Sequence, residues 1–353
     1  MGGNALQVPV RRISATEMTR ISTHLNAVLR KELGVDVRFI PAYRSKPDFG
    51  DIDVIVERDK QLCEDGFVRF IHEDLMEIAR TFFNAREFAP NTSMLSFDYR
   101  DRVTDLEGVQ VDLLLTPSAH LQTSVDYYSY NDLGNFIGRI AHKMGLKFGH
   151  EGLMYLHRED DHLFRTLPVS SDLSRTLECL GFDPQRYARG FDTLEDIFAF
   201  AASSRYFHRD LFLLENRNHK ARTRDRKRAN YNSFLNYIAT HDLPQYSYPV
   251  DQNKEEWLPH IFKHFPAFEQ DLLLSRNDWD KQRKFKQVFN GKNVGAYTGL
   301  QGKELGAFMT AFREHLSSEE LLALVHQEDY QELEQRARGF LPEFQRSHKA
   351  FKI

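Results

Sequence analysis

The sequence contains very little cysteine. Its two cysteines, Cys63 and Cys179, lie far apart among 353 residues and form no CxxC pair, so we expect neither a disulfide scaffold nor a cysteine-ligated zinc site. No apolar run approaches the roughly 20 residues of a membrane span. The first residues lack the apolar stretch of a secretory signal, and Leu6 stands where a myristoylation signal needs Ser or Thr. We therefore expect a soluble, cytoplasmic protein with no membrane partner.

Excess basic charge is also missing. The formal net charge is −4, so the chain has no general basic charge for binding nucleic acid, and any site for a polyanion must be local. Hydrophobic residues make up 41% of the chain, which is enough for real cores, and we expect most of the 28 Phe and 14 Tyr to serve them. The length suits two or three domains.

Periodicity places the expected elements. An amphipathic helix spans 14–33, with Ser14 as its cap and Glu17 three residues on. Further along, the pattern predicts strands at 37–40 and 51–57, a helix at 68–83, and strands at 93–100 and 109–115. This order predicts an α+β fold: a mixed-sheet palm with helices on one face, followed from 131 onward by a mainly helical C-terminal region. We expect domains at 1–120, 121–205 and 206–353.

Carboxylates stand in the segment GDIDVIVE. In a strand, Asp51 and Asp53 point to the same side while Ile52 and Val54 face the core. Asp112 is the only charge in a second apolar strand, VQVDLLL, and an adjacent strand would bring it beside the other two. Carboxylates that repel one another are tolerated where a cation lies between them, and oxygen ligands suit Mg²⁺ or Mn²⁺. A bare DxD alone is more often surface decoration on an edge strand.

The turn before these carboxylates, YRSKPDFG, supplies Arg44, Ser45 and Lys46, and Gly50 permits close backbone approach. Cations and free backbone amides are what a triphosphate requires. The alternative reading is a solvated turn with incidental charge.

A second pattern lies at 127–145, YYSYNDLGNFIGRIAHKMG. In a helix that begins near Asn131, Asp132, Asn135 and Arg139 share one face, apart from the apolar positions. Taken alone, such a stripe is most often an ordinary solvated helix face.

Together these motifs resemble the catalytic region of family X DNA polymerases, in the polymerase-beta nucleotidyltransferase superfamily. In the family, an Arg-Ile pair leads into a helix, which Arg12-Ile13 and residues 14–33 match here. A strand and a turn ending in Gly-Asp-x-Asp follow in the family, and this sequence has RFI and then PAYRSKPDFGDID. The family also has an aromatic pair followed by a helix that carries Asp, Asn and Arg, and residues 127–139 match both. The segment FDTLEDIFAF at 191–200 resembles the one that closes the family's thumb. The likeness covers roughly residues 11–205. Pro41-Ala42 replaces the family's Gly-Ser, Ser45 replaces an Arg, and the turn is one residue shorter, so phosphate binding must be rebuilt here.

The resemblance implies roles for these residues. Asp51, Asp53 and Asp112 would bind two Mg²⁺ or Mn²⁺ ions, and Asp112 would accept the proton of the attacking hydroxyl. The residues implied to contact the nucleotide are Arg12, Arg44, Ser45, Lys46, Gly50, Tyr127, Tyr128, Asp132 and Asn135. Arg139 would face the template. The family's DNA-gripping lyase domain has no counterpart, so we expect no deoxyribose-phosphate lyase activity.

The C-terminal half adds a basic run, KARTRDRKR, in which six of nine residues are basic. Such a run is usually a solvated helix face, but beside a polymerase-like core it also suits a phosphate backbone, with Arg222, Arg226 and Lys227 as representative contacts. Residues 289–316 are faintly similar to the tail of CCA-adding tRNA nucleotidyltransferases, where a glycine turn leads into an amphipathic helix. We interpret the His-Asp pairs near 208 and 241 as incidental.

The expected function is transfer of a nucleoside monophosphate from a (d)NTP to a DNA or RNA 3′-hydroxyl, with release of pyrophosphate. Three alternatives stay open: template-independent addition to an RNA or tRNA 3′ end, nucleotidylation of a protein or small molecule, and a catalytically dead nucleic-acid-binding module. The sequence leaves the oligomeric state undetermined.

Overall fold

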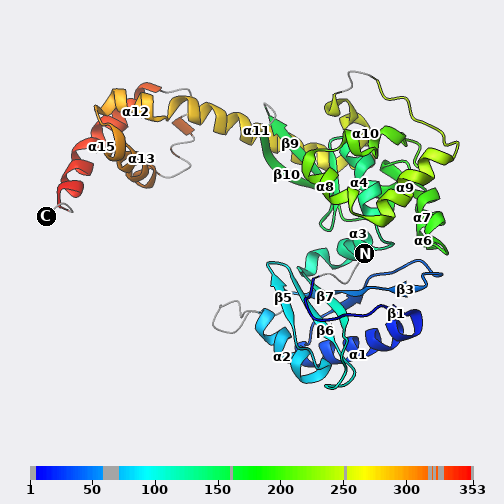
Figure 1. Ribbon diagram of the computed structural model, residues 1–353. Coiled ribbons are helices and arrows are strands. Elements are labelled where there is room, and N and C mark those ends of the chain that lie inside the picture. Colours follow the sequence, from blue (N-terminus) through cyan, green and yellow to red (C-terminus); the bar gives the residue numbers. More distant parts are fainter. Residues whose placement is uncertain are drawn as a thin grey trace. The chain divides into compact units, whose positions relative to one another are not determined.

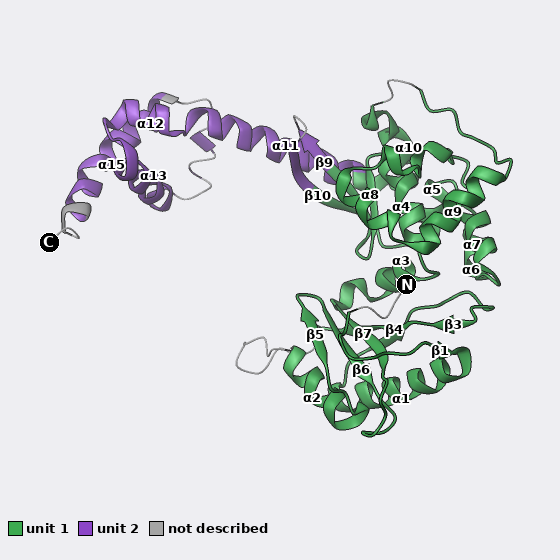
Figure 2. Cartoon of the chain, viewed as in Figure 1, with its two compact units in different colours: residues 1–156, 166–268 green, residues 157–165, 269–353 purple. Residues whose placement is uncertain are grey.

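The computed structural model describes residues 5–58, 71–159, 162–249, 253–316, 320, 323–324 and 330–350. Cys63 and positions 68–70 of the expected helix lie outside these ranges. The chain divides into two compact units (Figure 2): residues 1–156 with 166–268, and residues 157–165 with 269–353.

A five-stranded mixed sheet organises the first part of unit 1 (Figure 1), in the order β2-β4-β7-β6-β5. The strands are β2 (Val37–Phe39), β4 (Asp51–Glu57), β5 (Phe88–Asn91), β6 (Met94–Tyr99) and β7 (Val109–Thr116). β4 and β7 are parallel, and the other neighbouring pairs are antiparallel. The expected α+β class with a mixed sheet is confirmed. Strand β5 was not predicted from the sequence.

Two helices supply the core on one face of this sheet, α1 (Ala15–Leu33) and α2 (Ile71–Phe83). The predicted cap of α1 is confirmed, because Ser14 and Glu17 form a reciprocal capping box. Residues one helical turn apart on α1, including Ile21, Leu25 and Leu29, are buried against the sheet. On β4 the alternate residues Ile52, Val54 and Val56 join the same core, so the opposite side carries Asp51 and Asp53.

A short antiparallel pair, β1 (Ile13–Ser14) with β3 (Asp48–Phe49), fixes the turn before β4. Its register places Ile13 opposite Phe49, and so brings Arg12 close to Gly50. After the sheet the chain continues through η1 (Ser118–His120), α3 (Leu121–Tyr128) and α4 (Leu133–Lys143). α3 contacts β2 and β4.

The rest of unit 1 is mainly helical, as expected. Its helices are α5 (Leu173–Cys179), α6 (Pro184–Ala188), α7 (Leu194–Ala201), η2 (Arg209–Leu211), η3 (Leu214–Asn216), α8 (His219–Arg226), α9 (Ala229–Thr240), η4 (Lys254–Trp257) and α10 (Leu258–His264). The mainly helical region also contains strands that the sequence pattern did not predict. A three-stranded sheet, ordered β10-β9-β8, is formed by β8 (Leu146–Gly149), β9 (Gly152–Glu159) and β10 (His162–Ser170), and residues 157–165 of its last two strands belong to unit 2. Gly145 and Gly152, which precede β8 and begin β9, adopt positive φ angles that glycine tolerates.

Unit 2 is built around helices α11 (Pro266–Val288), α12 (Gly291–Thr298), α13 (Gly302–His315) and α15 (Tyr330–Ala350). The predicted stripe of α13 forms its core, with Phe308 and Phe312 fully buried against α15 residues such as Leu333. The glycine-containing segment before α13 is itself the helix α12, which ends at the left-handed Gly299. None of the helices within the described ranges combines the length and apolar character that a bilayer crossing requires.

Candidate nucleotidyl-transfer site

Three carboxylates converge at the parallel contact between β4 and β7. Asp53 pairs directly with Asp112 in the register, and Asp51 lies two residues before Asp53 on the same side of β4. One carboxylate oxygen from each residue lies within 4.8 Å of the others. The sequence predicted this convergence, and the parallel pairing explains it, because strands in register place equivalent positions side by side.

The charges of this acidic triad (Asp51, Asp53 and Asp112) disfavour one another. Burial, and after it the charges of the neighbouring Asp51 and Asp112, together raise the pKa of Asp53 to about 7, while Lys46 opposes the shift. Burial also raises the pKa of Asp112, which is only 7% exposed. Gln110 opposes that shift by donating from Nε2 to both carboxylate oxygens of Asp112 at 3.0 Å. Three acids held together at such a cost indicate a site that a cation would neutralise.

Asp51 and Asp53 open into a cavity of about 610 Å³. Both signs of charge line it: the cations are Arg12, Lys46, Lys227 and Arg228, and the other acids are Asp48 and Asp132. Tyr43, Gly50, Asn131 and Asn230 complete much of the remaining wall. The cavity therefore places side chains that attract phosphate beside side chains that attract metal.

Two of the predicted cations stand next to the triad. The Arg12 guanidinium bonds to Asp48 at 2.5 Å and also feels the charge of Asp51. Lys46 Nζ lies 4.5 Å from the centre of the Phe49 ring. Burial lowers the pKa of Lys46, and the charges of Asp51 and Asp53 counteract part of that shift.

Arg44 and Ser45, which the resemblance assigns to the nucleotide, contact the segment around Asp192 and do not face the cavity. Arg44 forms an ion pair with Asp192 at 2.6 Å and donates to the carbonyl of Arg189, and the Ser45 amide donates to the carbonyl of Asp192 at 2.8 Å. Neither residue lines the cavity. Their contacts instead fasten the turn to the segment between α6 and α7.

The aromatic pair ends α3. Tyr127 and Tyr128 meet edge to face at 5.2 Å, and Tyr128 stacks near His150. Burial raises the pKa of Tyr128, and the charge of Asp53 adds to this, so its hydroxyl lies in the field of the triad. The pair thus stands between the carboxylates and α4.

The three polar residues of α4 differ in their surroundings. Asp132 is buried and accepts a bond from Arg228. Asn135 accepts a long bond of 3.4 Å from Arg224, and Arg139 donates to the Leu211 carbonyl at 3.0 Å. Burial beside Arg217 lowers the pKa of Arg139. Of these three only Asp132 lines the cavity.

The basic run forms α8 and the turn after it, and its side chains lie in different surroundings. Arg222 donates to the Arg217 carbonyl at 3.1 Å, Arg226 is exposed, and Lys227 reaches the cavity. The sequence reading missed Arg228, which also lines the cavity and pairs with Asp132. Its membership of the run was the available signal, but nothing in the spacing indicated which cation would face the carboxylates.

Neither a protein-family model nor a curated protein matches this sequence. Among solved structures, the chain is similar to the crystal structure of Leishmania infantum polymerase beta in a ternary P/T complex. The alignment covers 48% of this chain and 73% of that one, with 15% identity and a TM-score of 0.39. The likeness concerns the fold alone.

Chemically, the arrangement combines hard oxygen donors with cations across a small cavity. The triad can hold a divalent metal, since carboxylate oxygens are the preferred ligands of Mg²⁺ and Mn²⁺. Arg12, Lys46, Lys227 and Arg228 can attract an anion that binds beside such a metal. A metal-bound polyphosphate satisfies both sets of side chains.

Proposed function

We propose that this protein is a magnesium-dependent nucleotidyltransferase that joins a nucleoside monophosphate from a (d)NTP to a nucleic-acid 3′-hydroxyl and releases pyrophosphate. The observation that carries the proposal is the convergence of Asp51, Asp53 and Asp112, of which Asp51 and Asp53 line a cavity together with four cations. Within this proposal, residues 1–120 are the catalytic domain, 121–205 the nucleotide-binding segment, and 206–353 a helical nucleic-acid-binding domain.

The donor set fits Mg²⁺ or Mn²⁺, because all three donors are carboxylates, and burial together with the charges of Asp51 and Asp112 raises the pKa of Asp53 despite the nearby Lys46. Two bound ions would lower the pKa of the attacking hydroxyl and stabilise the leaving pyrophosphate. Asp51 and Asp53 would hold the ion on the nucleotide side. Asp53 and Asp112 would hold the ion on the acceptor side, with Asp112 accepting the hydroxyl proton.

The cations of the cavity would bind the triphosphate. Arg12 and Lys46 flank the carboxylates from the turn, and Lys227 and Arg228 reach in from the end of α8. Gly50 would offer its backbone at the same wall, and Tyr128 would lie against the sugar. In this proposal Arg44 and Ser45 act indirectly, by fastening the turn through Asp192 and Phe191.

A second candidate differs in its acceptor: template-independent addition to an RNA 3′ end. Arg139 favours it, because this residue donates to the Leu211 carbonyl and does not line the cavity, whereas a template-reading arginine needs access to the nucleic acid. Arg222 and Arg226 would contact the acceptor's phosphate backbone in either case.

The test is incubation with Mg²⁺, α-labelled dNTPs or NTPs, and a DNA or RNA primer with and without template. We expect a primer extended by labelled nucleotide, with release of pyrophosphate, and loss of the product with Asp53→Asn. Asp101→Asn, which changes an acid outside the cavity, is the matched control and should retain activity. Extension without template selects the second candidate, and an Asp53→Asn variant as active as the wild type refutes both.

A further inference from the structure

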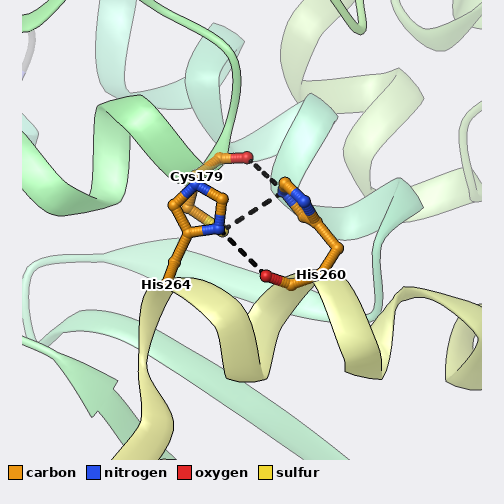
Figure 3. Close-up of side chains that lie close together, drawn as sticks. All are labelled: Cys179, His260 and His264. Carbon is orange, nitrogen blue, oxygen red and sulfur yellow. Dashed lines mark hydrogen bonds between the residues drawn. The ribbon is translucent and has the colours of Figure 1, made fainter.

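A second cluster of possible metal ligands lies in unit 1, away from the acidic triad in sequence. Cys179 is the last residue of α5, and His260 and His264 stand one turn apart on α10. Figure 3 shows the thiol and both imidazoles turned toward one another, and a ligand atom from each lies within 4.8 Å of the other two. Cys179 is buried, and both histidines are half-buried.

The hydrogen bonds orient both histidine rings. Nδ1 of His264 donates to the His260 carbonyl at 2.9 Å, which leaves the lone pair of its Nε2 available. A backbone bond of this kind on one ring nitrogen commonly accompanies metal ligation by the other. His260 donates from Nε2 to the Cys179 carbonyl at 2.8 Å, and the same nitrogen lies 3.8 Å from Cys179 Sγ. Trp257 and Tyr206 pack edge to face on the His260 ring and hold it in place.

We propose that Cys179, His260 and His264 form a zinc site with three protein ligands and a fourth position open to water. Thiolate and imidazole are the donors that zinc prefers, and no carboxylate belongs to the cluster, so it differs in chemistry from the acidic triad. On binding, the Cys179 thiol releases its proton to solvent, and His260 changes tautomer: solvent takes the proton from Nε2 and supplies one to Nδ1, so the ring stays neutral and Nε2 binds the ion. The sequence predicts no cysteine-ligated zinc site because its cysteines do not pair, but this site requires only one.

The three ligands come from two helices, Cys179 from the end of α5 and the two histidines from α10. The ion would join α5 to α10 across 81 residues of sequence, and its binding energy would add to the stability of the fold.

The test uses the full chain with Asp51→Asn and Asp53→Asn, so that the acidic triad does not contribute. Zinc content after purification is measured by elemental analysis, and Co²⁺ replaces zinc to report on the ligands by absorption. We expect one zinc per chain, a sulfur-to-cobalt charge-transfer band, and a melting temperature that falls when zinc is chelated.

Two further variants in that background decide the matter. Cys179→Ser should abolish the charge-transfer band. His264→Gln should weaken zinc binding by about 100-fold or more, because loss of an outer-shell partner alone costs about 10–100-fold. His241→Gln, at the exposed end of α9, is the matched control and should bind as the parent does. The proposal is overturned if folded protein shows no charge-transfer band with Co²⁺, or if His264→Gln binds zinc as tightly as His241→Gln.

Discussion

Replacing Asp53 by Asn should make the metal-free protein more stable at neutral pH while it abolishes activity. Asp53 is half-buried beside two other carboxylates. Loss of solvent around the group, and then the charges of Asp51 and Asp112, raise its pKa from 3.8 to about 7. Above that pH the folded protein must hold this group charged in an unfavourable place, whereas the unfolded chain holds it in water. Asparagine keeps nearly the same shape without the charge.

The magnitude follows from the two pKa values. A difference of this size, at about 1.4 kcal/mol per pH unit, corresponds to roughly 4 kcal/mol in the free energy of unfolding. Asp53 keeps part of its surface at the cavity, so solvent weakens the penalty, and we expect a measured gain of about 1–3 kcal/mol. Since the folded pKa lies above the unfolded one, wild-type stability falls as pH rises from about 4 to about 7. The advantage of the variant should grow over the same range and then level off.

The assay is urea unfolding in EDTA across that pH range, for the wild type and Asp53→Asn. Asp48→Asn is the control. The hydrogen bond from Arg12 lowers the pKa of Asp48, so its charge is favourable in the folded protein, and removing that charge should not increase the free energy of unfolding. Added Mg²⁺ should stabilise the wild type more than Asp53→Asn. A variant that is less stable than the wild type above pH 7 without metal, or whose advantage does not change with pH, would refute this reasoning.

Three other variants test the surroundings of the site. Arg228→Gln should raise the KM for nucleotide by about 10-fold or more in steady-state kinetics, because a charged hydrogen bond is worth about 1.5–3 kcal/mol. Arg226→Gln, at an exposed residue outside the cavity, should leave the KM for nucleotide unchanged at saturating acceptor. Gly134→Ala should cost about 2 kcal/mol or more in thermal unfolding, since an added Cβ would lie 2.1 Å from the Tyr127 carbonyl oxygen. Gly138→Ala in the same helix meets only the Phe148 carbonyl oxygen at 3.5 Å and should be neutral or stabilising; equal losses in the two would contradict the steric argument. Ser14→Ala should lower the stability by about 1 kcal/mol through loss of the capping box, which chemical denaturation measures, and an unchanged midpoint would show that the box contributes nothing.

Local patterns in the sequence predicted the part of the fold that holds the triad. Alternation along β4 placed Asp51 and Asp53 on one side, and Ser14 with Glu17 marked the start of α1. The position of Asp112 inside an apolar strand indicated that it belonged with them. These signals suffice because each depends on neighbours within a few residues and on one strand pairing.

These local patterns could not predict contacts between residues that lie far apart in the sequence. The bond from Arg228 to Asp132 joins residues 96 positions apart, and the Arg44–Asp192 pair spans 148. The short strands β8 to β10 were not predicted, because brief apolar runs favour neither the helical nor the strand period clearly. Cys179 and His260 come together only through the packing of α5 on α10, which no spacing in the sequence indicates.

Binding of Mn²⁺ tests most directly whether the acidic triad is a cation site. Electron paramagnetic resonance measures the free ion, and a His264→Gln background removes the second cluster from the titration. We predict that this protein depletes the free-ion signal and that Asp53→Asn and Asp112→Asn each largely restore it. Equal depletion by the parent and both variants would contradict the account.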